Sequence, residues 1–250
     1  MHYLTRDLLL MVITQALGTL SLLAMFVFIF KGSLDLVGLN MDESGALTLD
    51  SLLSIAFFVQ HSGMVRKSFK RWSTQLIAEK YGGIVFSLAS SFLLIATVAL
   101  WQKSGVTVVS AHGGARWLLR LIFGLSFLGF LWGASSIGSL DTFGLEQLRK
   151  SIQGRTIKPP RLVIRGPYRW IRHPLYFFCI VMIWSCPDVT IDRLLFNVLW
   201  TVWIIVGIFL EERDLVSQFG DCYLRYQRDV PMLIPTRLSP QRNGIDGRPR

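Results

Sequence analysis

The hydrophobic positions of this chain fall into long blocks separated by shorter polar stretches. Five blocks are mostly apolar and nearly free of charge: 11–30, 47–59, 84–101, 117–137 and 194–210. A helix that crosses a bilayer needs about 20 such residues. The pattern therefore predicts an all-α, polytopic integral membrane helical bundle, whose first four membrane segments lie near 8–31, 48–65, 82–101 and 116–138.

A shorter apolar run, 175–186, follows Pro174 and ends at the Pro187-Asp188 step, and the run 194–210 comes soon after it. We interpret these two runs as a helical hairpin, which gives about six membrane segments in all. The last run continues into a polar segment of helical pattern that we expect to emerge from the bilayer. A cleaved signal peptide is the alternative for the first block, but that block is too long for an ordinary signal sequence and lacks a small-residue cleavage site.

The net charge of +10 is distributed in a way that indicates membrane topology rather than nucleic-acid binding. Basic residues gather at 66–71, at 149–172 and from 213 to the end, whereas acidic residues mark the intervening loops at 31–47 and 188–193. Alternating basic and acidic loops are the pattern that the positive-inside rule describes. The sequence thus predicts a multi-pass protein with both termini in the cytoplasm and anionic membrane lipids as partners, and no nucleic-acid partner.

The chain divides by composition into three regions. Residues 1–138 form a four-span N-terminal membrane region, residues 139–235 a C-terminal region with a long cytoplasmic loop, the hairpin and the emergent helix, and residues 236–250 a tail that we expect to be disordered. A loop as long as 139–173 is usually functional. The three cysteines, Cys179, Cys186 and Cys222, are odd in number and lack metal spacing, so we predict neither a disulfide framework nor a metal site.

The most informative polar stretch is RGPYRWIRHPLYFF, residues 165–178. Pro174 suits the first position of a helix, which makes His173 the natural cap residue. The free N–H groups of the first turn, together with Arg172, favour a carboxylate or a phosphate. Contact of Arg172 and His173 with lipid headgroups is the alternative.

The emergent helix carries a second set of polar and aromatic residues. If it stays helical, one stripe holds, at spacings of three or four, Glu212, Leu215 or Val216, Phe219, Tyr223 and Tyr226. Gly220 is a point at which this helix can break. Glu211 and Glu212 stand side by side just below a membrane segment, and pairing with one of the arginines 165, 169 or 172 is the alternative to a role in ligand binding.

These residues carry a resemblance to a known family. LVIRGPYRWIRHPLYF and EERDLVSQFGDCYLRYQRDVPMLIP resemble the C-terminal signature of the isoprenylcysteine carboxyl methyltransferase superfamily, and the match covers about the last third of the chain. FFVQHSGMVRKSFKRW and LDTFGLEQ are similar to the branch of methanethiol S-methyltransferases and NnrU-like membrane proteins. One residue departs from the pattern: Phe178 stands where the family usually has glycine, which bears on local packing.

The resemblance implies a membrane enzyme with a cytoplasmic C-terminal region that binds S-adenosylmethionine. It implies that Arg172 and the helix start after His173 and Pro174 hold the carboxylate, and that Glu211 or Glu212 holds the ammonium or a ribose hydroxyl. Aromatic walls would come from Tyr168, Tyr176, Tyr223 and Tyr226, and a backbone wall from Val163 and Gly166.

The methyl acceptor that the branch implies is a small thiol. A thiol reacts as its thiolate, so His61 is our candidate for a base and Arg120 for a group that steers the thiolate. A solvated interfacial histidine and a snorkelling arginine are the alternatives for these two residues. The alternative functions are methylation of a lipid-like acceptor, namely a prenylated cysteine or a phospholipid amine, an NADPH-dependent reductase of the sterol-reductase type, and a non-catalytic NnrU-like protein. The oligomeric state is not given by these patterns.

Overall fold

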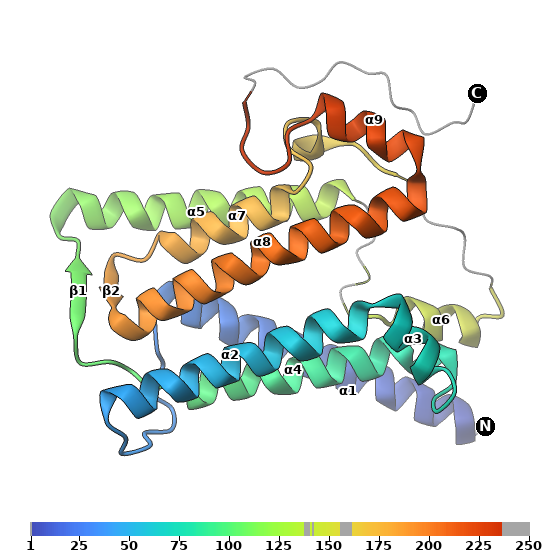
Figure 1. The fold of residues 1–250 in the computed structure, drawn as a ribbon. Helices are drawn as coiled ribbons and strands as arrows, with labels where there is room; N and C mark the ends of the chain where they lie inside the picture. The colour runs from blue at the N-terminus through green and yellow to red at the C-terminus, as the bar shows by residue number, and fades with distance from the viewer. Residues whose placement is uncertain (1, 138–140, 142, 156–161, 237–250) are drawn as a thin grey trace. The chain divides into compact units, whose positions relative to one another are not determined.

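The computed structural model of the chain describes residues 2–137, 141, 143–155 and 162–236, and it is mostly helical (Figure 1). The elements, in chain order, are α1 (His2–Lys31), α2 (Glu43–Val65), α3 (Lys67–Ser73), the 3₁₀ turn η1 (Glu79–Tyr81), α4 (Gly82–Leu100), β1 (Thr107–Ser110), α5 (Gly113–Ser136), α6 (Glu146–Ile152), the 3₁₀ turn η2 (Gly166–Arg169), α7 (Pro174–Trp184), β2 (Asp188–Thr190), α8 (Ile191–Phe219) and α9 (Asp221–Asp229). The tail predicted to be disordered lies outside the described residues, except for its first residue.

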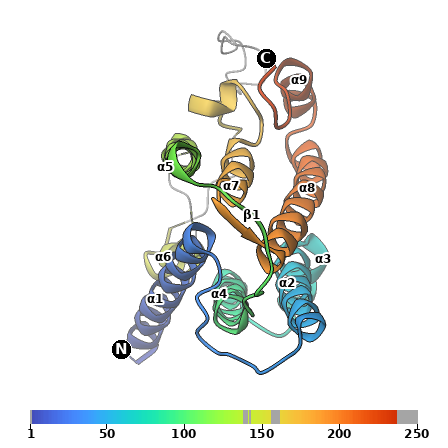
Figure 2. The same ribbon diagram turned by 90° about the vertical axis from the view of Figure 1, so that its left-hand side faces the viewer.

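The chain forms two compact units, which we describe separately. The first holds α1 to α4, α6, β2 and α8 up to Leu199, and the second holds α5, η2, α7, α8 from Trp200 and α9. In the first unit α4 lies between α1 and α2 and packs against both (Figure 2). Asp42 caps the start of α2 by accepting a hydrogen bond from the N–H of Gly45 at 3.1 Å, as expected of an aspartate at this position.

Two acidic residues of the first unit, Asp50 and Asp192, are buried and have hydrogen-bond donors as partners. Asp50 on α2 is fully buried and accepts a hydrogen bond from the backbone N–H of Gln102 at 3.0 Å. Asp192 on α8 accepts hydrogen bonds from Trp101 Nε1 at 3.1 Å and from the N–H of Ser104 at 3.0 Å. Both carboxylates therefore bind the segment that follows α4 and fix the direction in which the chain leaves that helix.

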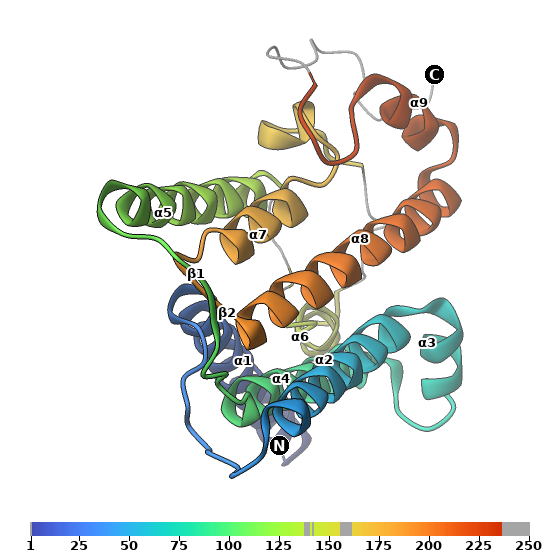
Figure 3. The same ribbon diagram turned by 60° about the vertical axis from the view of Figure 1, so that its left-hand side comes forward.

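In the second unit α5 and α7 lie side by side, and α9 turns back after the end of α8 (Figure 3). The contact between α5 and α7 answers the question raised by Phe178. A Cβ atom on Gly129 of α5 would lie 2.3 Å from the Phe178 ring, so the bare backbone of Gly129 makes the space that this ring fills. Glycine at 129 thus allows α5 to lie close to the Phe178 ring of α7.

Four helices in the described part of the chain are long and apolar enough to cross a membrane, over Thr5–Lys31, Glu79–Leu100, Gly113–Ser136 and Ile191–Phe219. Large apolar side chains stay exposed on them: Val12 is 65% exposed and Trp117 76%, as expected of residues that face lipid. α2 and the 11-residue α7 lie outside this set, so a count of six stays a prediction. The all-α expectation needs one correction, because β1 and β2 pair in a small two-stranded sheet.

Candidate functional site

The turn that leads into α7 is shaped by one glycine and two prolines. Pro167 and Pro174 stand in the first turns of η2 and α7, where a missing N–H removes no helical hydrogen bond. Gly166 has a φ of 53°, and a Cβ atom there would lie 2.1 Å from Ser136 Oγ at the end of α5. Both features require glycine. The prediction that α7 begins at Pro174 with His173 as its N-cap residue is confirmed.

The carboxylate of Glu212 is the centre of a buried polar cluster. Its Oε1 accepts hydrogen bonds from Arg172 Nε at 2.9 Å, His173 Nε2 at 2.7 Å and the Tyr223 hydroxyl at 2.7 Å. Its Oε2 accepts from Arg172 Nη2 at 3.0 Å and from the amide of Gln227. We call these five residues the Glu212 cluster. The side chains of Arg172 and Glu212 are each 9% exposed, so a bidentate ion pair is held almost out of solvent.

The last turn of α9 and the segment that follows it complete the hydrogen bonding of Arg172. Nη1 of its guanidinium donates to the carbonyls of Gln227 and Val230. The backbone N–H of Arg172 donates to the carbonyl of Pro231 at 2.9 Å, and that of His173 to the carbonyl of Met232 at 3.1 Å. The guanidinium thus has two carboxylate oxygens and two carbonyls as acceptors. The alternative in which a glutamate pairs with an arginine is confirmed for Glu212 and Arg172.

A tyrosine core lies directly beside this cluster. Tyr223 is 1% exposed, and Tyr226 and Val230 are equally buried; the apolar side chains packed against them are Leu162, Ile164, Leu215, Val216 and Phe219. The hydroxyl of Tyr226 donates to the carbonyl of Tyr168 at 2.6 Å. Burial raises the pKa of both Tyr223 and Tyr226, so each phenol keeps its proton and acts as a donor.

The stripe from Glu212 to Tyr226 was predicted for an unbroken helix, with Gly220 as the point at which the helix can break. The helix is not continuous, because Gly220 has a φ of 55° and separates α8 from α9. The turn at Gly220 nevertheless returns Tyr223 to Glu212, which lies 11 residues earlier. The residues of the stripe therefore meet through a break in the helix rather than along one helix face.

Glu211 differs from Glu212 in its exposure and in its hydrogen bonding. Its side chain is 43% exposed, and its Oε2 is buried without a hydrogen-bond partner among the described residues. Nδ1 of His173 lies 3.8 Å from this oxygen. The phenols of Tyr168 and Tyr176 lie beside Glu211, and Tyr176 is placed to donate a hydrogen bond to its carboxylate. The Tyr176 ring lies 5.7 Å from that of His173. One carboxylate is thus fully bonded, and the other retains an acceptor.

The structure brings together most of the residues predicted for cofactor binding: Arg172, His173, Tyr168, Tyr176, Glu211, Glu212, Tyr223 and Tyr226. Val163 lies between Leu162 and Ile164, both of which pack on the tyrosine core. No contact described above tests whether any of these residues binds a cofactor, and those assignments stay predictions.

None of the hydrogen bonds and ring contacts described above involves His61 or Arg120. His61 belongs to the first unit, where its ring lies 5.3 Å from that of Phe57 and 5.1 Å from that of Phe86. Arg120 belongs to the second unit but lies 13 residues before Gly133, which contacts the first turn of α7 through Leu175. At 1.5 Å per residue this spacing places Arg120 about 20 Å along α5 from Gly133.

The sequence reading missed Gln227 and the carbonyls of residues 227–232. Gln227 follows Tyr223 by four residues, so the two share a face of α9, and this spacing is the signal that points to it. The carbonyls leave no signal in residue type, because any residue supplies one. Only the spatial return of the chain to Arg172 identifies them.

The chain is 35% identical over 195 residues to a methanethiol S-methyltransferase of Pseudomonas deceptionensis, a match that covers 76% of this chain and 73% of the relative. It is 32% identical over 231 residues to methanethiol S-methyltransferase 2 of Bradyrhizobium diazoefficiens, with 89% and 86% covered. A more distant similarity, 25% over 185 residues, links it to Nurim of Rattus norvegicus. No family model and no solved structure matches. By its similarity to these enzymes over most of both lengths, the chain belongs to the methanethiol S-methyltransferase family.

Proposed function

We propose that this protein is an integral membrane methyltransferase that uses S-adenosylmethionine to methylate a small thiol such as methanethiol. The names of its relatives support the reaction, since they match most of the chain at 32–35% identity. S-adenosylmethionine, when bound, supplies an electrophilic methyl group on a positively charged sulfur. Its amino-acid end adds an ammonium and a carboxylate, and both need partners in the protein.

The observation that supports a cofactor of this chemistry is the unbonded oxygen of Glu211. A buried carboxylate oxygen without a donor is costly unless a ligand or water supplies one. An ammonium carries N–H donors and the opposite charge, so it suits Glu211 Oε2 on both counts. Glu212 has no such capacity left, because five donors already surround it. Of the two glutamates, we therefore assign Glu211 to the cofactor.

The carboxylate and the rings of the cofactor have candidate partners close to Glu211. The first turn of α7 carries N–H groups without helical acceptors, which suit a carboxylate. Arg172, whose donors are already engaged, positions this turn and adds positive charge behind it. Tyr168 and Tyr176 offer aromatic walls, with backbone from Val163 and Gly166. Tyr223 and Tyr226 support these walls from the buried side.

The membrane topology in this proposal extends the four apolar helices to six segments. α2 and α7 are the additional ones, and both termini then lie in the cytoplasm together with the basic segments near the ends of α2 and α8. The start of α7, the end of α8 and the segment from α9 to residue 232 face the cytoplasm, where S-adenosylmethionine is made. An apolar thiol reaches the site from either phase. His61 is the candidate base and Arg120 the candidate steering group for its thiolate.

Labelled methyl transfer tests the reaction directly. Purified protein is supplied with S-adenosylmethionine labelled in its methyl group, and with methanethiol, a prenylated cysteine and phosphatidylethanolamine in parallel. We expect labelled dimethyl sulfide from methanethiol and background with the two lipid-like acceptors. Transfer to a lipid-like acceptor alone contradicts the thiol assignment, and no transfer to any acceptor supports the non-catalytic alternative. Thermal stabilisation by NADPH but not by S-adenosylhomocysteine supports the reductase.

A pair of variants tests the role of Glu211. Glu211→Gln keeps the shape but removes the charge that an ammonium requires, so we expect KM for S-adenosylmethionine to rise about tenfold or more, which is about 1.4 kcal/mol of lost binding. KM for the thiol is expected to stay within about twofold. Glu43→Gln, an exposed glutamate at the start of α2, is the matched control. Equal KM values for the two variants contradict the assignment.

A further inference from the structure

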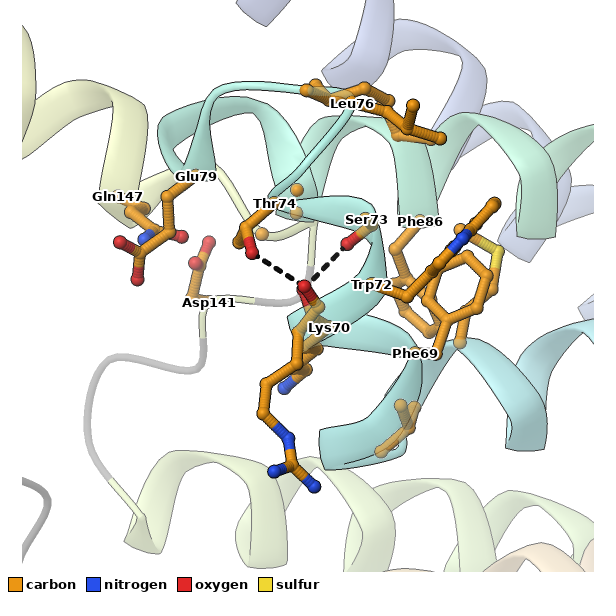
Figure 4. A pocket seen from close by; sticks show the side chains of 18 residues that line it. Phe69, Lys70, Trp72, Ser73, Thr74, Leu76, Glu79, Phe86, Asp141 and Gln147 are labelled. Atoms are coloured by element: carbon orange, nitrogen blue, oxygen red, sulfur yellow. Dashed lines mark hydrogen bonds between the residues drawn. The ribbon is translucent and has the colours of Figure 1, made fainter.

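A second candidate site lies in the first unit, in a cavity of about 800 Å³. Its walls come from α3, the end of α2, the start of α4 and residues near α6 (Figure 4). Cavities of this volume hold ligands of drug-like size. Methanethiol has only two heavy atoms and would leave most of this space to water, so the dimensions of the cavity indicate a larger occupant.

One wall of the cavity is aromatic and reaches the protein surface. Phe69, Trp72 and Phe86 gather on one side of the cavity in Figure 4, and the rings of Phe69 and Trp72 lie 5.4 Å apart. Trp72 is 55% exposed, and Leu76 at the rim is 69% exposed. Such side chains are unfavourable in water but suit the boundary between headgroups and acyl chains. An apolar chain on the occupant would cover these rings.

The polar part of the lining carries both signs of charge. Lys70 and Arg71 contribute two positive charges, and Glu79 and Asp141 contribute two negative ones. In Figure 4 Glu79 and Asp141 lie together, on the side opposite the aromatic wall. The Asp141 carboxylate is held in place by the N–H groups that begin α6, at 2.7 and 2.9 Å. A lining that carries both signs and no net charge is complementary to a zwitterion, whereas a purely anionic headgroup would meet the carboxylates unfavourably.

We propose that this cavity binds a membrane phospholipid of the ethanolamine type. Its phosphate contacts Lys70 and Arg71, its ammonium contacts Glu79 and Asp141, and the first carbons of its acyl chain lie on the aromatic wall. The carboxylates select a headgroup with N–H donors over choline, which has none. Binding occurs without the methyl donor, so the proposal stands or falls independently of the methyl-transfer activity.

The test measures lipid binding to the full-length protein in detergent after removal of endogenous lipid. Native mass spectrometry yields apparent Kd values for phosphatidylethanolamine, phosphatidylcholine and phosphatidylglycerol with equal acyl chains. We expect phosphatidylethanolamine to bind about tenfold more tightly than phosphatidylcholine, a typical value for one charge-assisted contact. Equal affinity for these two lipids, or tighter binding of phosphatidylglycerol than of phosphatidylethanolamine, overturns the proposal.

Variants assign the two halves of the headgroup to their partners. Glu79→Gln is expected to abolish the preference for ethanolamine over choline. The double variant Lys70→Gln, Arg71→Gln is expected to bind all three lipids about tenfold more weakly. Asp35→Asn and Lys103→Gln, exposed in the loops of the same unit, are the matched controls and should leave all affinities within about twofold. Since Glu79 is exposed, the Glu79→Gln variant is expected to fold, and it is sufficient for the test. An unchanged preference of this variant for phosphatidylethanolamine over phosphatidylcholine refutes the proposal.

Discussion

The Arg172–Glu212 ion pair gives the sharpest prediction about stability. Glu212→Ala removes a carboxylate that accepts hydrogen bonds from four side chains. The guanidinium of Arg172 then keeps only the two carbonyls of Gln227 and Val230, and its positive charge has lost its counter-charge. Because the Arg172 side chain is 9% exposed, water replaces the carboxylate only if the site opens.

Loss of one partner from a buried ion pair typically destabilises a protein by about 3–5 kcal/mol. For a chain of this size, 1 kcal/mol corresponds to a change in melting temperature of about 2–4 °C. We therefore expect Glu212→Ala to lower the melting temperature by about 6–20 °C. Glu211→Ala, at the next position of the same helix, removes a half-exposed carboxylate with an unbonded oxygen. It should lower the melting temperature by no more than about 4 °C.

The melting temperature is followed by intrinsic tryptophan fluorescence of the detergent-solubilised protein. A double-mutant cycle then isolates the pair: Arg172→Met, Glu212→Met and both together. Replacing both partners of a buried ion pair by apolar residues often changes the free energy of unfolding little. The loss of stability in the double variant should therefore be smaller than the sum of the two single losses, by about 1–3 kcal/mol. Additive effects, or a Glu212→Ala protein that melts within about 2 °C of the parent, would refute the reasoning.

Three further predictions concern packing and hydrogen bonding in the second unit, each measured as a change in melting temperature. Tyr223→Phe loses a hydrogen bond to a carboxylate and should destabilise the protein by about 1.5–3 kcal/mol, whereas Tyr226→Phe loses one to a carbonyl and should cost about 0.5–1.5 kcal/mol. A larger loss of stability in Tyr226→Phe than in Tyr223→Phe contradicts the assigned acceptors. Gly129→Ala should cost about 1–3 kcal/mol by overpacking against the Phe178 ring, and Phe178→Leu in the same chain should restore most of it. Gly166→Ala should destabilise the protein by about 1–3 kcal/mol or more, because φ at this position is positive and Ser136 Oγ lies close to the added methyl group. An unchanged melting temperature would show that this turn adjusts to the methyl group.

Local sequence chemistry predicted the elements around the site well. Pro174 marked the start of α7 because proline is compatible with the first turn of a helix and with few other helical positions. Gly220 was recognised as a point where the last helix can break, and the chain does turn there. These predictions succeeded because each depends on one residue and its immediate neighbours.

The sequence allowed a glutamate to pair with one of three arginines, but it did not select the pair or the other long-range contacts. Arg172 and Glu212 are 40 residues apart, and an arginine in a basic loop is as compatible with a bound anion as with a glutamate. Asp50 interrupts an apolar run and meets the backbone of Gln102, which lies 52 residues away. β1 and β2 have only four and three residues, too short to show a periodic pattern. In each case the missing information is a tertiary contact, not a local preference.

The return of the chain to Arg172 has a consequence for biosynthesis. The carbonyl of Val230 lies 58 residues after the guanidinium that it binds, and the carbonyls of Pro231 and Met232 come later still. During translation Arg172 thus leaves the ribosome well before its acceptors exist, and water or the insertion machinery must solvate it in the meantime. A chain that stops before α9 leaves this arginine with an incomplete set of partners beside the membrane. The full set of partners for Arg172 therefore exists only after synthesis has passed residue 232.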